Sequence, residues 1–93
     1  MAVCIISGML KKVNGEPLKE ARVYFSIPRY PVATSDKEIV STTEVVVLTD
    51  DTGTLTIPLM QGIVIKVTSH DAGIKDKEFI VPSTTTADLA DLL

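Results

Sequence analysis

The sequence predicts an all-β fold, an antiparallel sandwich of about six or seven strands that ends in a short helix. Turn-forming clusters at residues 14–17 and 50–53 stand directly before runs in which apolar and polar residues alternate, a pattern typical of strands joined at corners. The composition is 45% hydrophobic but only 4% aromatic, so Val, Ile and Leu must build the core, and β-branched residues favour strands. We expect residues 1–93 to form a single domain, with the strands within residues 3–81.

The first half of the chain contains three expected strands. Residues 3–10 are apolar at both odd and even positions, which predicts a strand that is covered on both faces. Residues 21–27 alternate cleanly, so one face should lie in the core and the other in water. Within residues 39–49, the apolar run 45–48 does not alternate, which favours a central strand over an exposed edge.

A hairpin is expected in the second half. Residues 55–59 and 63–67 alternate on either side of Gln61 and Gly62, a spacing typical of a hairpin. Pro58 places the first of these strands at a sheet edge or at its own end, because proline cannot donate to the ladder. The remaining segments are two loops and a last short strand: a long loop over 29–37, a polar loop over 69–77 and a strand over 78–81.

The C-terminal stretch, residues 85–93, predicts the one helix. Thr85 stands three residues ahead of Asp88, as in a capping box, and Leu89, Leu92 and Leu93 follow at helical spacing. A helix of about eight residues is not stable alone in water, so its leucines must dock on something. We expect them to pack on their own domain; the alternative is that they reach a neighbouring subunit.

Several turn and strand motifs together carry a resemblance to a known family: Gly8, the turn 15–18, the strand start 21–23, the turn and strand 49–55, and Gly62 before 63–67. Over residues 3–81 they resemble the carboxypeptidase regulatory-like, or transthyretin-like, β-sandwich domains. That resemblance implies an immunoglobulin-like sandwich and says almost nothing about activity. The closing stretch 79–93 is similar to the ends of small β-modules in phage virion proteins, which implies a tail-associated or head-associated particle component.

Groups that could carry out nucleophilic chemistry are sparse. Cys4 is the single cysteine and is expected to be a small buried hydrophobe. The only histidine, His70, stands between Ser69 and Asp71, but consecutive residues do not generally face one another as a catalytic triad requires. A polar loop between strands accounts for these residues. A hydrolase of the transthyretin-like type would need clustered histidines and arginines, which one His and two Arg hardly provide.

No cofactor or metal is expected. Asp50, Asp51 and Gly53 predict a tight turn in which Gly53 adopts positive φ and an aspartate accepts backbone N–H bonds. A calcium loop would need alternating oxygen ligands and a terminal Glu, and these are missing. One Cys and one His cannot make a closed zinc site. The glycines are dispersed, one to a turn, so there is no phosphate-binding loop.

The charge and the apolar runs limit the partners. A net charge of −3 and a pI near 4.9 argue against nucleic acid, whose binding needs a clustered basic surface. No apolar run approaches the length of a membrane span. Residues 1–10 lack a positively charged n-region, so we expect synthesis in the cytoplasm without an export signal of its own. A virion or phage-like particle fits that expectation.

The sequence therefore predicts a non-enzymatic structural or protein-interaction module with no catalytic residues. Its partner is expected to be protein, through self-association or through other particle proteins. The candidate partner contacts are Arg29 and Tyr30 in the long loop, together with Leu89, Leu92 and Leu93 in the alternative in which the C-terminal leucines reach a neighbouring subunit. The alternative is a ligand-binding or regulatory sandwich appended to a larger surface protein, which recognises carbohydrate or peptide through loops around Tyr30 and His70.

Overall fold

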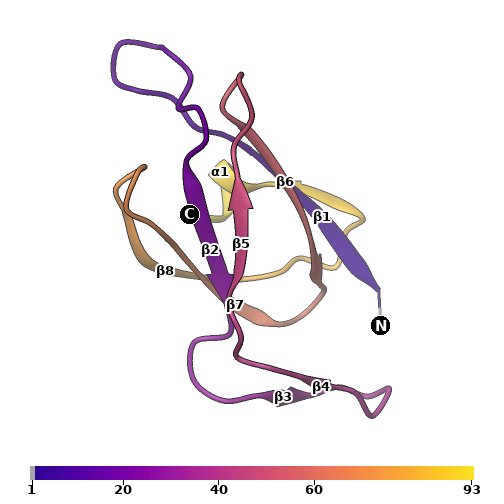
Figure 1. The fold of residues 1–93 in the computed structure, drawn as a ribbon. Coiled ribbons are helices and arrows are strands. Elements are labelled where there is room, and N and C mark those ends of the chain that lie inside the picture. Colours follow the sequence, from indigo (N-terminus) through magenta and orange to yellow (C-terminus); the bar gives the residue numbers. More distant parts are fainter. Residues whose placement is uncertain (1) are drawn as a thin grey trace.

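The computed structural model describes residues 2–93, which form a β-rich structure with one short C-terminal helix (Figure 1). The elements follow one another in this order: β1 (Val3–Met9), β2 (Arg22–Ser26), β3 (Val32–Ala33), β4 (Ile39–Val40), β5 (Val45–Leu48), β6 (Thr54–Met60), β7 (Val64–Ser69), β8 (Ile74–Ile80), β9 (Thr86–Asp88) and α1 (Leu89–Leu92). The expected β-rich class and the C-terminal position of the helix are confirmed.

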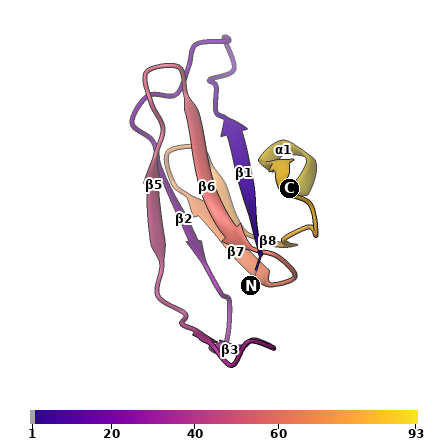
Figure 2. The ribbon, with the colours of Figure 1, turned by 90° about the vertical axis from the view of Figure 1, so that its right-hand side faces the viewer.

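The strands form two larger sheets and a small ribbon. One sheet has the order β6–β1–β9, the other has the order β5–β2–β7–β8, and β3 and β4 pair as a ribbon that projects from one end (Figure 2). All pairs are antiparallel except β1 with β9, which is parallel. Both larger sheets contribute side chains to a single core, an arrangement compatible with a β-sandwich.

The core follows the alternation in the sequence. On β2, Val23 and Phe25 are buried, as expected for residues 21–27. On β6 and β7 the same alternation buries every second residue. The buried apolar residues are mostly aliphatic, and burial of this surface is the main favourable term in folding. They are Cys4, Ile6, Val23, Phe25, Ile27, Leu55, Ile57, Leu59, Ile63, Ile65, Val67, Phe79, Val81 and Leu89.

The expected hairpin between residues 55–59 and 63–67 is wrong. β6 pairs with β1 and β7 pairs with β2 and β8, so the two segments belong to different sheets. The chain crosses between the sheets at Gln61 and Gly62, and Gly62 has φ +82°. The side-chain Nε2 of Gln61 donates to the Val3 and Thr84 carbonyls. Alternation fixes which residues face the core, and both a hairpin and a crossing satisfy it.

Two burial expectations are also wrong. β5 is an edge strand rather than a central one, and Val45, Val46 and Leu48 are about half exposed. β1 is central in its sheet but is buried on one face only, so that Val3, Ile5 and Met9 face outward. Apolar residues on both faces therefore mark an apolar outer surface here, and not a second buried layer.

The loops contain more structure than expected, and the strands have different limits. The predicted loop over 29–37 includes β3, which pairs with β4. The predicted strand over 39–49 is interrupted at residues 41–44, which separate β4 from β5. β8 begins at Ile74 rather than at residue 78, because its N-terminal half pairs with β7 despite a run of charged residues. Nine strands are assigned within residues 2–93, more than the six or seven expected.

The helix is shorter than residues 85–93. α1 covers only Leu89–Leu92, and Thr86–Asp88 forms β9 instead. The Ile5 N–H donates to the Thr85 carbonyl, so the capping-box segment pairs with β1 and is not available to a helix. Asp88 is the N-cap residue but makes no side-chain cap bond. Leu89 packs over Gly8 of β1, where the missing Cβ leaves room for it.

A chain of hydrogen bonds joins the two sheets at the end opposite the ribbon. The Leu10 N–H donates to the Gly53 carbonyl, and the Leu18 N–H donates to the Leu10 carbonyl. The buried Thr49 hydroxyl accepts from the Ala21 N–H at 2.9 Å and donates to the Leu18 carbonyl at 2.6 Å. These bonds connect the end of β1, the segment before β2 and the turn between β5 and β6. We name this set of five residues the sheet junction.

Gly53→Ala should destabilise the protein more than Gly62→Ala does. Both glycines have positive φ, but a Cβ at Gly53 would lie 2.3 Å from the Leu10 carbonyl oxygen, whereas a Cβ at Gly62 would meet nothing within 4 Å. We expect Gly62→Ala to cost about 1–2 kcal/mol from backbone strain, and Gly53→Ala to cost about 2 kcal/mol more. Urea denaturation measures both. Equal losses would contradict the close contact.

Thr49→Val should cost about 3 kcal/mol, because it leaves the buried Ala21 N–H and the Leu18 carbonyl without their partner. Thr68→Val is the matched control, since the Thr68 hydroxyl donates to Asp76 on the exposed surface of the same sheet. That control should change the free energy of unfolding by less than about 1 kcal/mol. A Thr49→Val protein as stable as the control would show that the junction is not needed.

Candidate interaction site at the ribbon end

Arg29 and Tyr30 lie where the chain leaves β2 for the ribbon. Pro28 and Pro31 flank them, and each proline fixes its own φ near −65°, which limits the freedom of the connection. The Tyr30 side chain is 76% exposed. The segment therefore holds a large aromatic side chain in water at the end of the four-stranded sheet.

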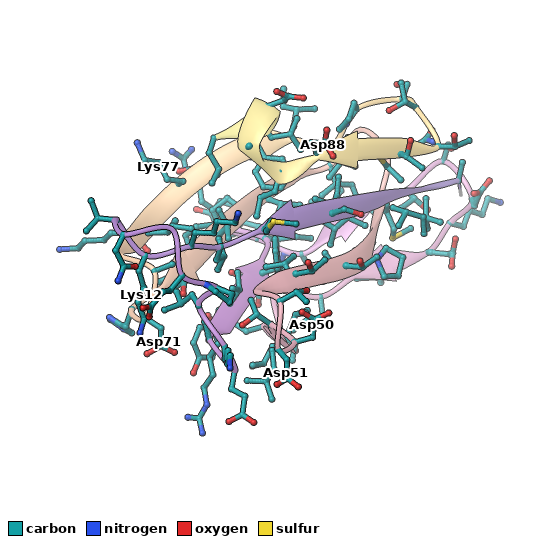
Figure 3. The ribbon with its side chains drawn as sticks, turned by 90° about the horizontal axis from the view of Figure 1, so that it is seen from above. Lys12, Asp50, Asp51, Asp71, Lys77 and Asp88 are labelled. Carbon is teal, nitrogen blue, oxygen red and sulfur yellow. The ribbon has the colours of Figure 1, made fainter. Side chains whose placement is uncertain are left out.

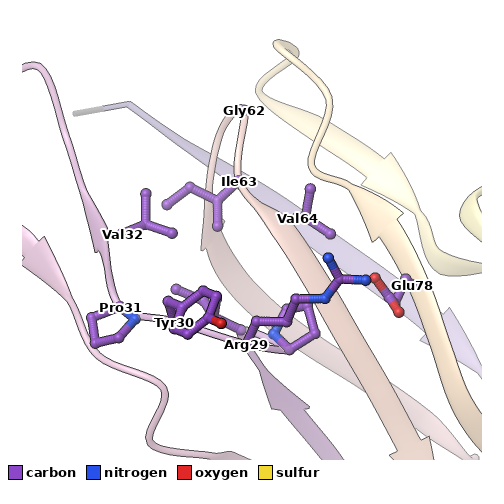
Figure 4. Close-up of a pocket in the computed structure, with 10 residues that line it drawn as sticks. Arg29, Tyr30, Pro31, Val32, Gly62, Ile63, Val64 and Glu78 are labelled. Atoms are coloured by element: carbon purple, nitrogen blue, oxygen red, sulfur yellow. The ribbon is translucent and has the colours of Figure 1, made fainter.

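These residues line an open pocket of about 470 Å³ (Figure 4). Ile27, Val32, Ile63 and Val64 supply its apolar wall, and Glu78 of β8 lies at its rim. Figure 4 shows the Arg29 side chain extending toward Glu78, away from Tyr30. The pocket thus combines an apolar wall, one exposed aromatic ring and one charge of each sign.

The C-terminal leucines lie elsewhere. Leu89 is 2% exposed and belongs to the core, Leu92 packs partly against that core, and Leu93 is half exposed. The expectation that these leucines pack on their own domain is confirmed for Leu89 and Leu92. Only Leu93 presents a large exposed surface to a neighbour, and it does not lie with Arg29 and Tyr30 in the pocket.

A second apolar opening lies between β5 and β6. It has a volume of about 220 Å³, and Phe25, Val45, Pro58 and Ile65 are among the residues that line it. Val45 lines this opening together with its β2 neighbour Phe25 and remains half exposed. No sequence pattern predicts this opening, because residues 45–48 are all apolar and nothing in the run distinguishes Val45 from a fully buried residue.

The outer faces of β1 and β5 carry exposed apolar side chains that the sequence pattern places in the core. Val46 and Leu48 are exposed on β5, and Val3 and Ile5 are exposed on β1. One signal was available: both segments are apolar at odd and even positions, and only one face of each strand packs on the core. A small domain has few layers to cover a second face.

Ser69 and Asp71 have structural roles. The Ser69 hydroxyl donates to the Arg22 carbonyl at 2.8 Å and accepts from the Ala72 N–H, and Asp71 accepts from the Arg22 N–H. They tie the β7–β8 turn to β2, while His70 is exposed between them. Cys4 is fully buried in the core, as expected, with its sulfur 3.8 Å from the Thr84 hydroxyl.

Asp50 organises the turn between β5 and β6 (Figure 3). Its Oδ1 accepts from the Thr52 N–H, the Thr52 hydroxyl and the Thr54 N–H. The hydroxyl bond from Thr52, followed by the backbone N–H bonds, lowers the pKa of this exposed carboxyl from its ordinary value. The expectation of a turn aspartate that accepts backbone bonds is confirmed, and so is positive φ at Gly53, which is +78°.

Among residues 2–93, no three His, Cys, Asp or Glu side chains gather in a way that could hold a metal ion. Within the same residues, no helix has both the length and the apolar character needed to cross a membrane.

The stability that Asp50 contributes should depend on pH. Because its pKa is lower in the folded state, its contribution is present above the unfolded pKa and is lost as the pH falls through the folded pKa. We expect the stability advantage of the wild type over Asp50→Asn to shrink between neutral pH and about pH 3. Urea denaturation at several pH values measures it. Asp51→Asn is the control, and an equal pH dependence in both variants would contradict the assignment.

No family model matches this chain, and no curated protein matches its sequence.

Proposed function

We propose that this chain is a non-enzymatic structural or protein-interaction module with an immunoglobulin-like or transthyretin-like sandwich fold. The observation that carries the proposal is the ribbon-end pocket, where two prolines hold Arg29 and a largely exposed Tyr30 beside an apolar wall. Tyr and Arg are enriched among the residues that dominate binding energy at protein interfaces. A rigid connection also lowers the entropy cost of docking.

The placement of the polar side chains supports a structural role. The hydroxyls of Thr49 and Ser69 hold backbone segments together. The Asp50 carboxylate caps the β5–β6 turn, and the Asp71 carboxylate ties the β7–β8 turn to β2. A nucleophile needs a base within hydrogen-bond reach and an open cleft around it. In this arrangement each of these groups already serves the fold.

The particle assignment rests on the resemblance of residues 79–93 to the closing stretch of small phage virion modules. In this chain the stretch completes the fold, because β9 pairs with β1 and Leu89 enters the core. We therefore propose a component of a phage or phage-like particle whose partners are other particle proteins or further copies of the chain, and not nucleic acid or membrane.

A second candidate function is ligand recognition, with the domain appended to a larger surface protein. The pocket of about 470 Å³ beside Tyr30 favours it, since this volume falls within the range of small-molecule sites. Its apolar wall and single aromatic ring fit an apolar peptide side chain better than a sugar. Glycan and peptide arrays probed with the purified chain test this candidate, and an array without signal above background removes it.

Particle incorporation tests the main proposal. We expect mass spectrometry of purified particles to find the chain at a fixed copy number, and Tyr30→Ala to lower its incorporation about tenfold or more through loss of an aromatic anchor. Ile39→Ala is the control, because Ile39 is also exposed on the ribbon but does not line the pocket. A chain absent from particles and found only as a free monomer would refute the particle assignment.

A further inference from the structure

Each larger sheet has two edges, and three of these four edges are protected against pairing with another strand. β6 contains Pro58, which cannot donate to a ladder. β8 carries four consecutive charged residues and positive φ at Asp76. β9 is only three residues long and runs directly into α1. Proline, charge, irregularity and shortness are the usual devices that keep strand edges apart.

The fourth edge, β5, is also short, at four residues, but it does not run into a helix and has none of the other devices. Its residues Val45–Leu48 are all apolar, without charge, proline or recorded irregularity, and within residues 2–93 they pair only with β2. Val46 is 50% exposed and Leu48 is 56% exposed. In Figure 2 this strand lies on the outer side of the molecule. An unprotected apolar edge is a template for another strand.

The backbone of this edge is oriented for pairing. The Thr49 N–H donates to the Ala21 carbonyl, so Thr49 faces β2. Because consecutive residues of a strand direct their N–H and C=O groups to opposite sides, Val46 and Leu48 direct theirs to the free edge. The sheet junction fixes this orientation, since the Thr49 hydroxyl is held at both ends.

We propose that β5 pairs antiparallel with β5 of a second copy, around a two-fold axis at Val46. The proposal rests on the interaction role proposed above and names the partner as the chain itself. Residues paired across such an axis lie on the same face, so Val46 meets Val46 of the second copy, and Leu48 meets Glu44 of the second copy. The two four-stranded sheets then join into one continuous sheet, with about six new backbone hydrogen bonds.

Charge complementarity selects this register. Arg22 is the β2 neighbour of Leu48, so Arg22, Leu48 and Glu44 of the second copy lie in one row across the outer face. Arg22 and that Glu44 are two strand spacings apart, about 10 Å, which their two long side chains span. A shift by one residue on each strand would instead bring Glu44 to Asp50 of the second copy. The Asp50 backbone is already bonded to Thr54 and Gly53 within its turn, and the two carboxylates would repel each other.

The same register continues an apolar row. Tyr24 is the β2 neighbour of Val46, and the row runs from Tyr24 through both Val46 side chains to Tyr24 of the second copy. Cross-strand pairs of aromatic and β-branched residues stabilise sheets. The two β5 strands thereby lie at the centre of a larger sheet, and the side chains of Val46 and Tyr24 shield one another from water.

Sedimentation equilibrium tests the pairing on the purified chain. We expect the mass to rise from 10.0 kDa toward twice that value in a concentration series up to about 1 mM, because an interface of this size belongs to the weak class. Val46→Lys places two like charges on the axis and should raise the dissociation constant about tenfold or more. Ile80→Lys adds the same charge on protected β8 and should leave it unchanged.

Two further measurements distinguish loss of the dimer from loss of folding in a variant. Glu44→Arg and Arg22→Glu should each weaken the dimer, and the double variant should restore it. Val46→Cys should form an intermolecular disulfide under oxidised glutathione, and Ile80→Cys should not; buried Cys4 stays in both. A chain that is monomeric throughout, with no excess crosslinking at position 46, overturns self-pairing. If it still enters particles through Tyr30, the proposed function stands without this dimer.

Discussion

The sheet junction is the constraint on which the rest of the structure depends. Its hydrogen bonds run from Gly53 through Leu10 and Leu18 to Thr49 and Ala21, so they connect segments that belong to both larger sheets. Each bond is made between groups that would be costly to bury without a partner. The turn set by Asp50 positions Gly53 for the first of these bonds, and Thr49 positions β5 for the last. Loss of the junction would therefore free β5 and β6 together.

Local chemistry in the sequence predicted the strands and turns, but not their partners. Alternation around Val23 and Phe25 predicts a strand with one buried face, and Pro58 predicts a strand at an edge or at its own end. Both features are found in the structure, because each depends on the chemistry of one strand alone. Pairing depends on the path between strands. Gln61 and Gly62 fit a hairpin and a crossing equally well, and the crossing is fixed by contacts with Val3 and Thr84, distant in sequence. The helix predicted over residues 85–93 is too long for a related reason. A capping-box pattern is local, whereas the pairing of Thr86–Asp88 with β1 joins segments that are distant in sequence.

The candidate site was predicted in part. Arg29 and Tyr30 are residue types enriched at interfaces and belong to a long expected loop, and the structure places both at one pocket. The apolar wall behind them comes from Ile63 and Val64, which no spacing pattern connects to that loop. The exposed strand faces were missed for a different reason. Apolar residues at odd and even positions were assigned to burial on both sides, but this chain has too few layers to provide it.

The unprotected edge of β5 differs in kind from the other exposed apolar residues of the structure. An exposed valine on a sheet face costs little, since much of any protein surface is apolar. An exposed edge with the sequence Val45–Leu48 is different, because it offers unpaired backbone groups together with apolar side chains. The other three edges of the two larger sheets are protected by proline, by charge or by a short strand that runs into a helix. β5 is the one edge without such protection, and it lies between Arg22 on the neighbouring strand and Glu44 at its own start. In the proposed dimer, the two-fold axis uses the β5 edge of each copy once. The joined sheet then ends at the two protected β8 edges, so no further copy can add to it.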